Sequence, residues 1–173
     1  MIFRVATRRD LPAVLALLAD EDQVLDPASM RVGEEHERAF AAIESDARNE
    51  MLVLTDAGGG ARGDAGGNAG GGAGGGAGGG ETVLGCLQLT YVPGLGQGGQ
   101  ERALVEAVRV RADRRGEGLG AELMRLAAER ARGRGCGLVQ LTSNKRRTAA
   151  HRFYERLGFA RSHEGFKLPL QRQ

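Results

Sequence analysis

The 173-residue chain is poor in several residue types on which particular functions depend. It has no tryptophan, five phenylalanines and two tyrosines, so few rings are available to stack on nucleic-acid bases. Its net charge of +2 gives no strong attraction to a polyanion. The two cysteines, Cys86 and Cys136, are far apart and match no metal-binding or redox spacing. These deficits argue against a nucleic-acid partner and a metal site.

Long apolar runs are also missing from the chain. No stretch of about 18 apolar residues is present, and no signal peptide precedes the first predicted strand. We therefore expect a cytoplasmic protein with reduced thiols and no membrane contact. The length and the 41% hydrophobic share fit a single globular domain spanning residues 1–173.

Glycine is abundant but unevenly placed. Residues 58–80 hold 15 of the 29 glycines, and such a segment cannot bury enough apolar surface to become ordered. Replacing a five-residue hairpin loop by this segment costs only about 1.4 kcal/mol of closure entropy. We interpret residues 57–80 as a flexible insertion in a hairpin, not as a linker between domains.

Apolar periodicity and turn residues predict alternating strands and helices. This alternation favours a mixed α/β sandwich whose last two strands close the sheet as a hairpin. An acidic, irregular loop is expected at 19–31. Strands are predicted at 2–6, 51–55, 82–91, 102–111, 138–141, 159–160 and 165–170, and helices after Thr7, at 34–48, from 119 to 133 or 135, and at 148–157.

The most distinctive segment is a basic, glycine-spaced connection between a strand and a helix at 108–120. It reads Val-Arg-Val-Arg-Ala-Asp-Arg-Arg-Gly-Glu-Gly-Leu-Gly. Glycines let the backbone approach a ligand closely, and the helix directs its free N–H groups and positive dipole end into the turn. Such a turn can hold a phosphate or pyrophosphate. From this segment alone, a tight turn with a solvated basic surface stays open as the alternative.

Two familiar phosphate-binding motifs fit this segment poorly. A P-loop ends in Gly-Lys-Ser/Thr, whereas Leu119-Gly120-Ala121 stands here. A dinucleotide fingerprint has Gly-x-Gly-x-x-Gly after the first strand of the chain, with an acidic residue about 20 positions later. The spacing here is Gly-x-Gly-x-Gly, and the motif lies past the middle of the chain.

A second motif, Ala-His-Arg-Phe-Tyr-Glu-Arg-Leu-Gly-Phe, occupies residues 150–159. Together with Arg-Gly-Glu-Gly-Leu-Gly at 115–120, it closely resembles the GNAT N-acetyltransferase superfamily. The first segment resembles that family's Arg/Gln-x-x-Gly-x-Gly/Ala pyrophosphate loop, and the second resembles its Phe-Tyr-x-x-x-Gly-Phe helix end. The two motifs occur in the family's order, and the resemblance is strongest from about 104 to 168.

The resemblance implies an α/β fold with a mixed, mostly antiparallel twisted sheet of about six to seven strands flanked by four helices. It also implies an acetyl-CoA-dependent N-acetyltransferase without a metal, in which a primary amine attacks the thioester directly in a ternary complex. The acceptor would be a small-molecule amine, a lysine side chain or an N-terminal amine. Relatives often form homodimers, and the sequence leaves the oligomeric state open.

The resemblance further assigns cofactor contacts, most of them to the backbone. A bulky residue at Gly118 or Gly120 should therefore harm cofactor binding more than the loss of any single arginine. The pantetheine arm would add to the central strand at Val108, Arg109 and Val110, and the pyrophosphate would meet the amides of Arg115, Gly116, Glu117, Gly118, Leu119, Gly120 and Ala121.

One position departs from the family pattern. Seven residues before the tyrosine the family usually has an asparagine that contacts the cofactor arm, and Arg147 stands there in this chain. Either Asn144 takes over this contact or the contact is made differently. The basic run 145–147 is either a further contact for CoA phosphates or a solvated helix start.

Two side chains are candidates for proton transfer. By resemblance, Tyr154 protonates the departing thiolate, although its helical spacing with Phe153 and Leu157 would also suit core packing. Glu106 is the candidate general base. It precedes Val108 by two residues, so the two side chains are expected on one face of the strand. An ordinary strand-edge carboxylate is the alternative for Glu106, and His163 is a second candidate base.

The acceptor is not identified by the sequence. Asp20, Glu21, Asp22 and Asp26 make the loop at 19–31 acidic, which favours a cationic acceptor or is simply a solvated loop. The rival function is a catalytically silent acyl-CoA-binding regulatory module. Retention of Tyr154 and Glu106 argues against that rival without settling the matter.

Overall fold

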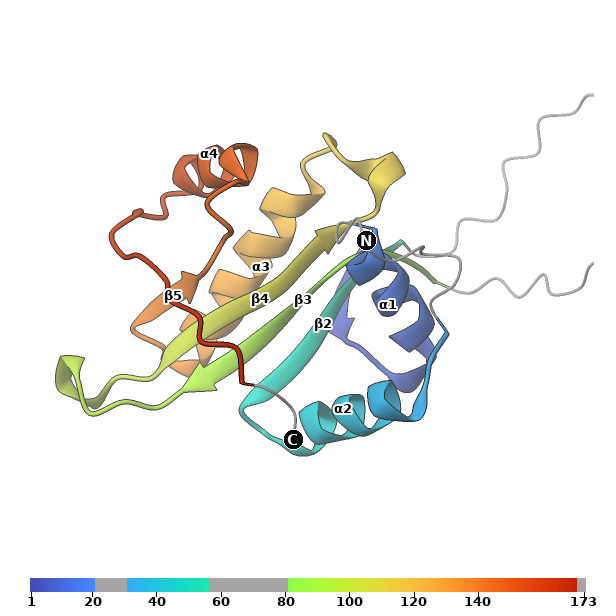
Figure 1. Cartoon of the computed structure of the whole chain (residues 1–173), viewed down its shortest axis with the longest axis horizontal. Helices are drawn as coiled ribbons and strands as arrows, with labels where there is room; N and C mark the ends of the chain where they lie inside the picture. The colour runs from blue at the N-terminus through green and yellow to red at the C-terminus, as the bar shows by residue number, and fades with distance from the viewer. Residues whose placement is uncertain (21–30, 57–80, 171–173) are drawn as a thin grey trace, which may run out of the picture.

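The computed structural model describes residues 1–20, 31–56 and 81–170 (Figure 1). The predicted glycine-rich insertion at 57–80 and most of the predicted acidic loop lie outside the described residues. The described elements are β1 (Ile2–Val5), α1 (Leu11–Ala19), α2 (Glu34–Ser45), β2 (Asn49–Asp56), β3 (Thr82–Val92), β4 (Arg102–Val110), α3 (Leu119–Arg134), β5 (Leu138–Leu141) and α4 (Thr148–Arg156).

The strands form one sheet in the order β1-β2-β3-β4-β5. Neighbours are antiparallel except for β4 and β5, which run parallel. The prediction of a mixed, mostly antiparallel sheet with four α-helices is therefore confirmed for the described residues. Figure 1 shows α3 crossing one face of the sheet, with α1 and α2 on the other.

Alternating side chains of the central strands fill two separate cores, one on each face of the sheet. Close approach of α3 requires a glycine at position 85, because an added Cβ would lie 2.8 Å from Leu123 Cδ1 and 2.7 Å from the Arg109 carbonyl oxygen. The core beneath α3 includes Leu52, Leu54, Leu87, Leu89 and Leu123, and the core beneath α1 and α2 includes Val14, Leu15, Phe40, Val53 and Cys86.

The predicted strands at 159–160 and 165–170 are wrong, and the described residues form five strands instead of six to seven. Residues 159–170 contain no strand and run across the sheet instead of pairing with β5 (Figure 1). Apolar alternation without a paired edge is not sufficient for a strand, and Pro169 has no N–H for a ladder. Phe166 and Leu168 are consequently 92% and 84% exposed.

Candidate functional site

A β-bulge interrupts β4 beside the predicted cofactor site. Gln88 pairs with Glu106 and Cys86 pairs with Arg109, so two residues of β4 stand opposite Leu87 alone. Ala107, within the bulge, has a φ of +54°. A non-glycine residue in this region costs energy and tends to occur at functional positions. The bulge had no sequence signal, because neither glycine nor proline marks it.

The bulge corrects one inference about the candidate base. Val108 packs with Leu87 and Val105 in the core beneath α3, whereas Gln88, the partner of Glu106, lies on the opposite face. The extra residue shifts the alternation by one position, so Glu106 and Val108 do not share a face. Glu106 is exposed on the face that carries α1 and α2, and no ion pair involves it among the described residues.

Beyond the bulge, no strand of the described residues lies on the β5 side of β4. The parallel pairing ends at Val105 and Leu141, but β4 continues to Val110. Sheet edges of this kind can add an extended chain, as they do for peptides. The Val108 and Val110 carbonyls already accept from Arg109 Nη1 and Arg115 Nε, at 3.0 and 3.1 Å. Val108, Arg109 and Val110, to which the resemblance assigns the pantetheine arm, lie in this part of β4.

The loop that follows β4 presents backbone amides at the start of α3. The first α3 hydrogen bond runs from the Glu122 N–H to the Gly118 carbonyl at 3.1 Å, which leaves the amides at 119–121 at the open helix end. Gly116 and Gly118 have φ values of +88° and +83°, a region that side chains disfavour. This geometry fits an anion held by main-chain N–H groups.

Gly120 contributes by packing. An added Cβ would lie 3.3 Å from Phe153 Cζ and 3.8 Å from Val110 Cγ2. The small residue lets the start of α3 approach both α4 and the end of β4. A substitution at Gly120 would therefore disturb helix packing as well as any bound group.

The arginines of the loop bond to the protein itself. Arg111 Nε lies 2.6 Å from Asp113 Oδ1, and Arg114 Nε lies 2.8 Å from Glu117 Oε2. Hydrogen bonding from Arg111 lowers the pKa of Asp113. Since each guanidinium already has a carboxylate partner, the side chains add little uncompensated positive charge to the loop.

Arg115 connects the loop to the end of α1. Its Nε donates to the Val110 carbonyl at 3.1 Å, and its Nη2 donates to Asp20. Asp20 was expected to make the acceptor loop acidic, but its charge is paired with Arg115. The acidic residues 21–26 lie outside the described residues.

Tyr154 lies in a cluster of aromatic rings at the end of α4. Its ring centroid is 5.1 Å from that of Phe153 and 5.9 Å from that of Phe159, both edge-on. Tyr154 is half-buried against the α3 core and also lines a pocket of about 770 Å³. Core packing and access to a pocket therefore coexist at this residue.

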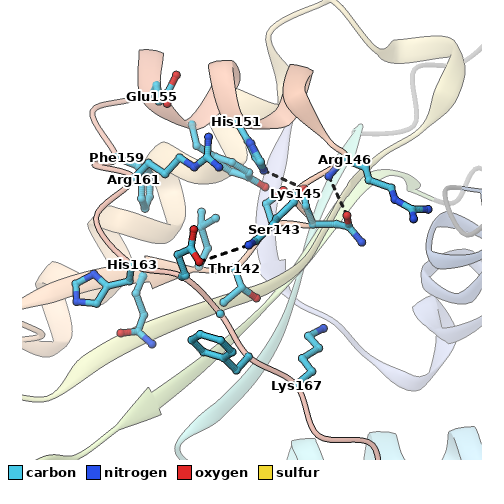
Figure 2. Close-up of a pocket in the computed structure, with 17 residues that line it drawn as sticks. Thr142, Ser143, Lys145, Arg146, His151, Glu155, Phe159, Arg161, His163 and Lys167 are labelled. Carbon is cyan, nitrogen blue, oxygen red and sulfur yellow. Dashed lines mark hydrogen bonds and ion pairs between the residues drawn. The ribbon is translucent and has the colours of Figure 1, made fainter.

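This pocket lies between the end of β5, the loop before α4, α4 itself and the C-terminal segment (Figure 2). Asn144 lines it, but its Oδ1 accepts from the Arg146 N–H at 2.9 Å and its carbonyl contacts His151 Nε2 at 2.9 Å. Asn144 therefore also shapes the turn into α4. Arg147 is exposed at the N-cap of α4 and is not part of the pocket lining.

Of the two candidate bases, one lines this pocket and the other does not. His163 lines it, with Nδ1 at 2.7 Å from Ser162 Oγ, whereas Glu106 is not among its lining residues. Sequence reasoning also missed Arg161 and Lys167, which line the pocket from the C-terminal segment. They were missed because a hairpin closing the sheet was expected for this segment, and such a hairpin would not have brought them into one pocket lining with Tyr154.

Other chemistries find little support in the described part of the chain. It holds no group of three or more His, Cys, Asp or Glu residues arranged to bind a metal ion. Within the same residues, no helix is long and apolar enough to span a membrane. Burial raises the pKa of the Cys86 thiol to about 12 and also raises that of Cys136, so neither is a ready thiolate.

Comparison with known proteins agrees with this geometry. Residues 30–159 match the family described as "Acetyltransferase (GNAT) family". The crystal structure of a transcriptional regulator from Bacillus halodurans C-125 is 37% identical, with a TM-score of 0.78 over 98% of this chain and 99% of its own. An acetyltransferase from Trypanosoma brucei is 25% identical, with a TM-score of 0.69 over 98% and 99% of the two chains.

A curated relative matches a shorter stretch. The aminoalkylphosphonate N-acetyltransferase of Salmonella typhimurium is 43% identical over 56 residues, which are 32% of this chain. The match spans 36% of the relative's own length.

Proposed function

The chain belongs to the GNAT family of acetyltransferases, and on that premise we propose that it transfers an acetyl group from acetyl-CoA to a primary amine. The observation that carries this proposal is the unpaired edge of β4, which leads directly into a glycine-shaped loop with open amides. An elongated molecule with a peptide-like arm and a pyrophosphate suits this combination.

Each part of the site has a distinct task in the proposal. Bound acetyl-CoA supplies the acetyl thioester. The backbone of 108–110 orients the arm, and the amides from Arg115 to Ala121 hold the pyrophosphate. Backbone donors near Val108 polarise the acetyl carbonyl, as preorganised N–H groups do for developing oxyanions.

Tyr154 is the proposed acid and Glu106 the proposed base. A phenol held beside the pocket can donate a proton to a leaving thiolate at neutral pH. Glu106 is exposed and has no ion-pair partner among the described residues, so its carboxylate is available to accept a proton. Its position on the face away from α3 suits action through a water molecule as well as direct action.

Direct attack by the amine is favoured over a covalent acetyl-enzyme. A covalent route would need an activated nucleophile such as a thiolate. Cys86 is buried with a pKa of about 12, and the pKa of Cys136 is also raised. The ternary-complex route makes no demand on either thiol.

We also propose a cytoplasmic location and a homodimer. The cytoplasm supplies acetyl-CoA and would keep the two free cysteines reduced. The outer edges of β1 and β5 have no strand partner in the described sheet, and such edges can pair between copies. Light scattering would give the mass of the particle in solution.

A regulatory module that binds acyl-CoA without transfer is the second candidate. It is favoured by the similarity to the transcriptional regulator of Bacillus halodurans, which is 37% identical over almost the whole chain. Such a protein would bind acetyl-CoA and leave the thioester intact when amines are added.

Amine-dependent release of CoA separates the two candidates. The purified protein is mixed with acetyl-CoA and a panel of primary amines, and free thiol and acetylated amine are measured together. Equal amounts of both products would support the transferase. Acetyl-CoA binding without release would support the regulatory module, and absence of binding would contradict both.

A further inference from the structure

Resting on the proposed N-acetyltransferase function, we propose that the acceptor amine carries a second, anionic group that Arg161 and Lys167 bind. A phosphonate, a phosphate monoester and a carboxylate share the required chemistry. The site is the pocket of about 770 Å³ that Tyr154 lines (Figure 2).

The charges around this pocket are unbalanced. Four lysine or arginine side chains line it, against the two glutamates Glu155 and Glu164. One of these glutamates, Glu164, already forms an ion pair, since Lys145 Nζ lies 3.4 Å from its Oε2. Neither Arg161 nor Lys167 has an ion-pair partner among the described residues, so their charges are available to a ligand.

Figure 2 shows how the remaining charges lie. Arg146 extends away from the C-terminal segment, and Glu155 stands at the far rim on α4. Arg161 and Lys167 come from the C-terminal segment itself, and both line the same pocket as Tyr154. A ligand in the pocket beside Tyr154 therefore occupies a lining that carries both of these cations.

This imbalance is not a general consequence of composition. The chain has 22 acidic residues for 24 lysines and arginines, and the three arginines of the cofactor loop each pair with a carboxylate. The lack of carboxylate partners for Arg161 and Lys167, which line the same pocket as Tyr154, is therefore particular to this pocket and does not follow from the overall charge of the chain. Guanidinium and ammonium groups without carboxylate partners suit phosphonate and carboxylate oxygens.

The apolar lining of the pocket suits a small organic acceptor. Leu141, Phe159 and Phe166 provide carbon surface between the charged groups. Arg161 and Lys167 lie just beyond the family match at 30–159. The short match to an aminoalkylphosphonate N-acetyltransferase is consistent with this class.

The test compares two amines of similar size, 2-aminoethylphosphonate and n-propylamine, with saturating acetyl-CoA. We expect kcat/KM for the phosphonate to exceed that for propylamine by at least tenfold. Arg161→Gln and Lys167→Gln should each lower kcat/KM for the phosphonate by roughly 10- to 100-fold, as for a lost hydrogen bond to a charged group. Their kcat/KM for propylamine and KM for acetyl-CoA should change less than threefold.

Arg156→Gln is the matched control, since Arg156 is exposed on α4 and does not line the pocket. It should leave the preference for the phosphonate unchanged. β-Alanine in place of the phosphonate tests whether a carboxylate is accepted as well.

Any of four results would overturn the inference. Faster transfer to propylamine, or equal losses on both amines in the two variants, would remove the anion-binding role. A raised KM for acetyl-CoA in the variants, absent with acetyl-dephospho-CoA, would assign the cations to the cofactor's phosphate. Absence of transfer to every amine would contradict the proposed function itself, and the inference would fail with it.

Discussion

Two basic regions of this protein use their cationic side chains in opposite ways. In the loop after β4, Arg111, Arg114 and Arg115 each bond to a carboxylate of the protein. Beside Tyr154, Arg161 and Lys167 have no such partner among the described residues. A ligand at the loop would therefore be held by backbone N–H groups, whereas a ligand in the pocket would be held by cationic side chains.

This difference shows why a basic motif is not by itself a binding site. Paired arginines fix the shape of a loop, and the open amides and glycines then set what it binds. Unpaired cations keep their charge for a ligand.

Tyr154→Phe should affect turnover most strongly. Removing the hydroxyl deletes the proposed proton donor but retains the ring that packs between Phe153 and Phe159. We expect kcat to fall by about 10²- to 10⁴-fold with little change in acetyl-CoA affinity. Tyr91→Phe is the control, because Tyr91 bonds to Glu50 at 2.9 Å and lies outside the pocket. Full turnover by Tyr154→Phe would remove this residue from the mechanism.

Glu106→Gln should lower kcat/KM at neutral pH by roughly 10²-fold, because the amine would lose its proton acceptor. The loss should shrink as the pH approaches the pKa of the free amine, where deprotonated acceptor becomes available. Pre-steady-state and steady-state rates across pH would measure this. Glu101→Gln is a suitable control, since Glu101 pairs with Arg134 at the other end of β4. A loss independent of pH would argue against a base.

The partly buried ion pair between Arg4 and Asp10, near the start of α1, should stabilise the folded state more than the exposed ion pairs of the loop do. Arg4 donates to Asp10 at 2.7 Å and holds the pKa of Asp10 at about 2, below its ordinary value of 3.8. Together with the hydrogen bonds from Thr7, this pair should make ionised Asp10 contribute about 2 kcal/mol to the unfolding free energy at neutral pH, a contribution lost as the pH falls through 3.8 toward 2.

Asp10→Asn should remove most of this pH dependence in urea denaturation at pH 2 to 6. Asp113→Asn is the comparison, since exposed pairs such as Arg111–Asp113 contribute little. An unchanged pH profile in Asp10→Asn would show that the pair does not stabilise the folded state.

The smallest effects are expected in the loop arginines. Arg111→Gln and Arg114→Gln should weaken acetyl-CoA binding less than about fivefold, the range for exposed ion pairs. Asp20→Asn should match Arg115→Gln, and the double variant should be no weaker than either single one. Tighter binding in Asp20→Asn would instead mean that a released Arg115 reaches the phosphates.

The regular elements could be predicted because their signals are local. The apolar alternation around Val105 and the capping glycine at 135 mark β4 and the end of α3. α2 ends earlier than expected, at Ser45, because Asp46 accepts hydrogen bonds from the Arg48 N–H and the Asn49 side chain. Such a side-chain turn competes with a further helical turn.

Features that depend on distant partners were not predictable. The bulge at Ala107 arises from pairing with β3, and it reverses the face on which Glu106 lies relative to Val108. The C-terminal alternation of Phe166 and Leu168 indicated a strand, yet Pro169 and the lack of a paired edge leave it irregular. The partners of Arg115 could not be found from spacing, since Asp20 is 95 residues away.

We propose that backbone geometry, not arginine charge, holds acetyl-CoA. Calorimetric titration of acetyl-CoA into the wild type, Gly118→Val and Arg114→Gln tests it most directly, with Gly133→Val as a control at an open helical position. A valine at φ +83° costs roughly 1–3 kcal/mol of strain, so Gly118→Val should bind at least tenfold more weakly. Arg114→Gln and Gly133→Val should bind nearly as the wild type does. Unchanged binding in Gly118→Val, or a larger loss in Arg114→Gln, would contradict the account.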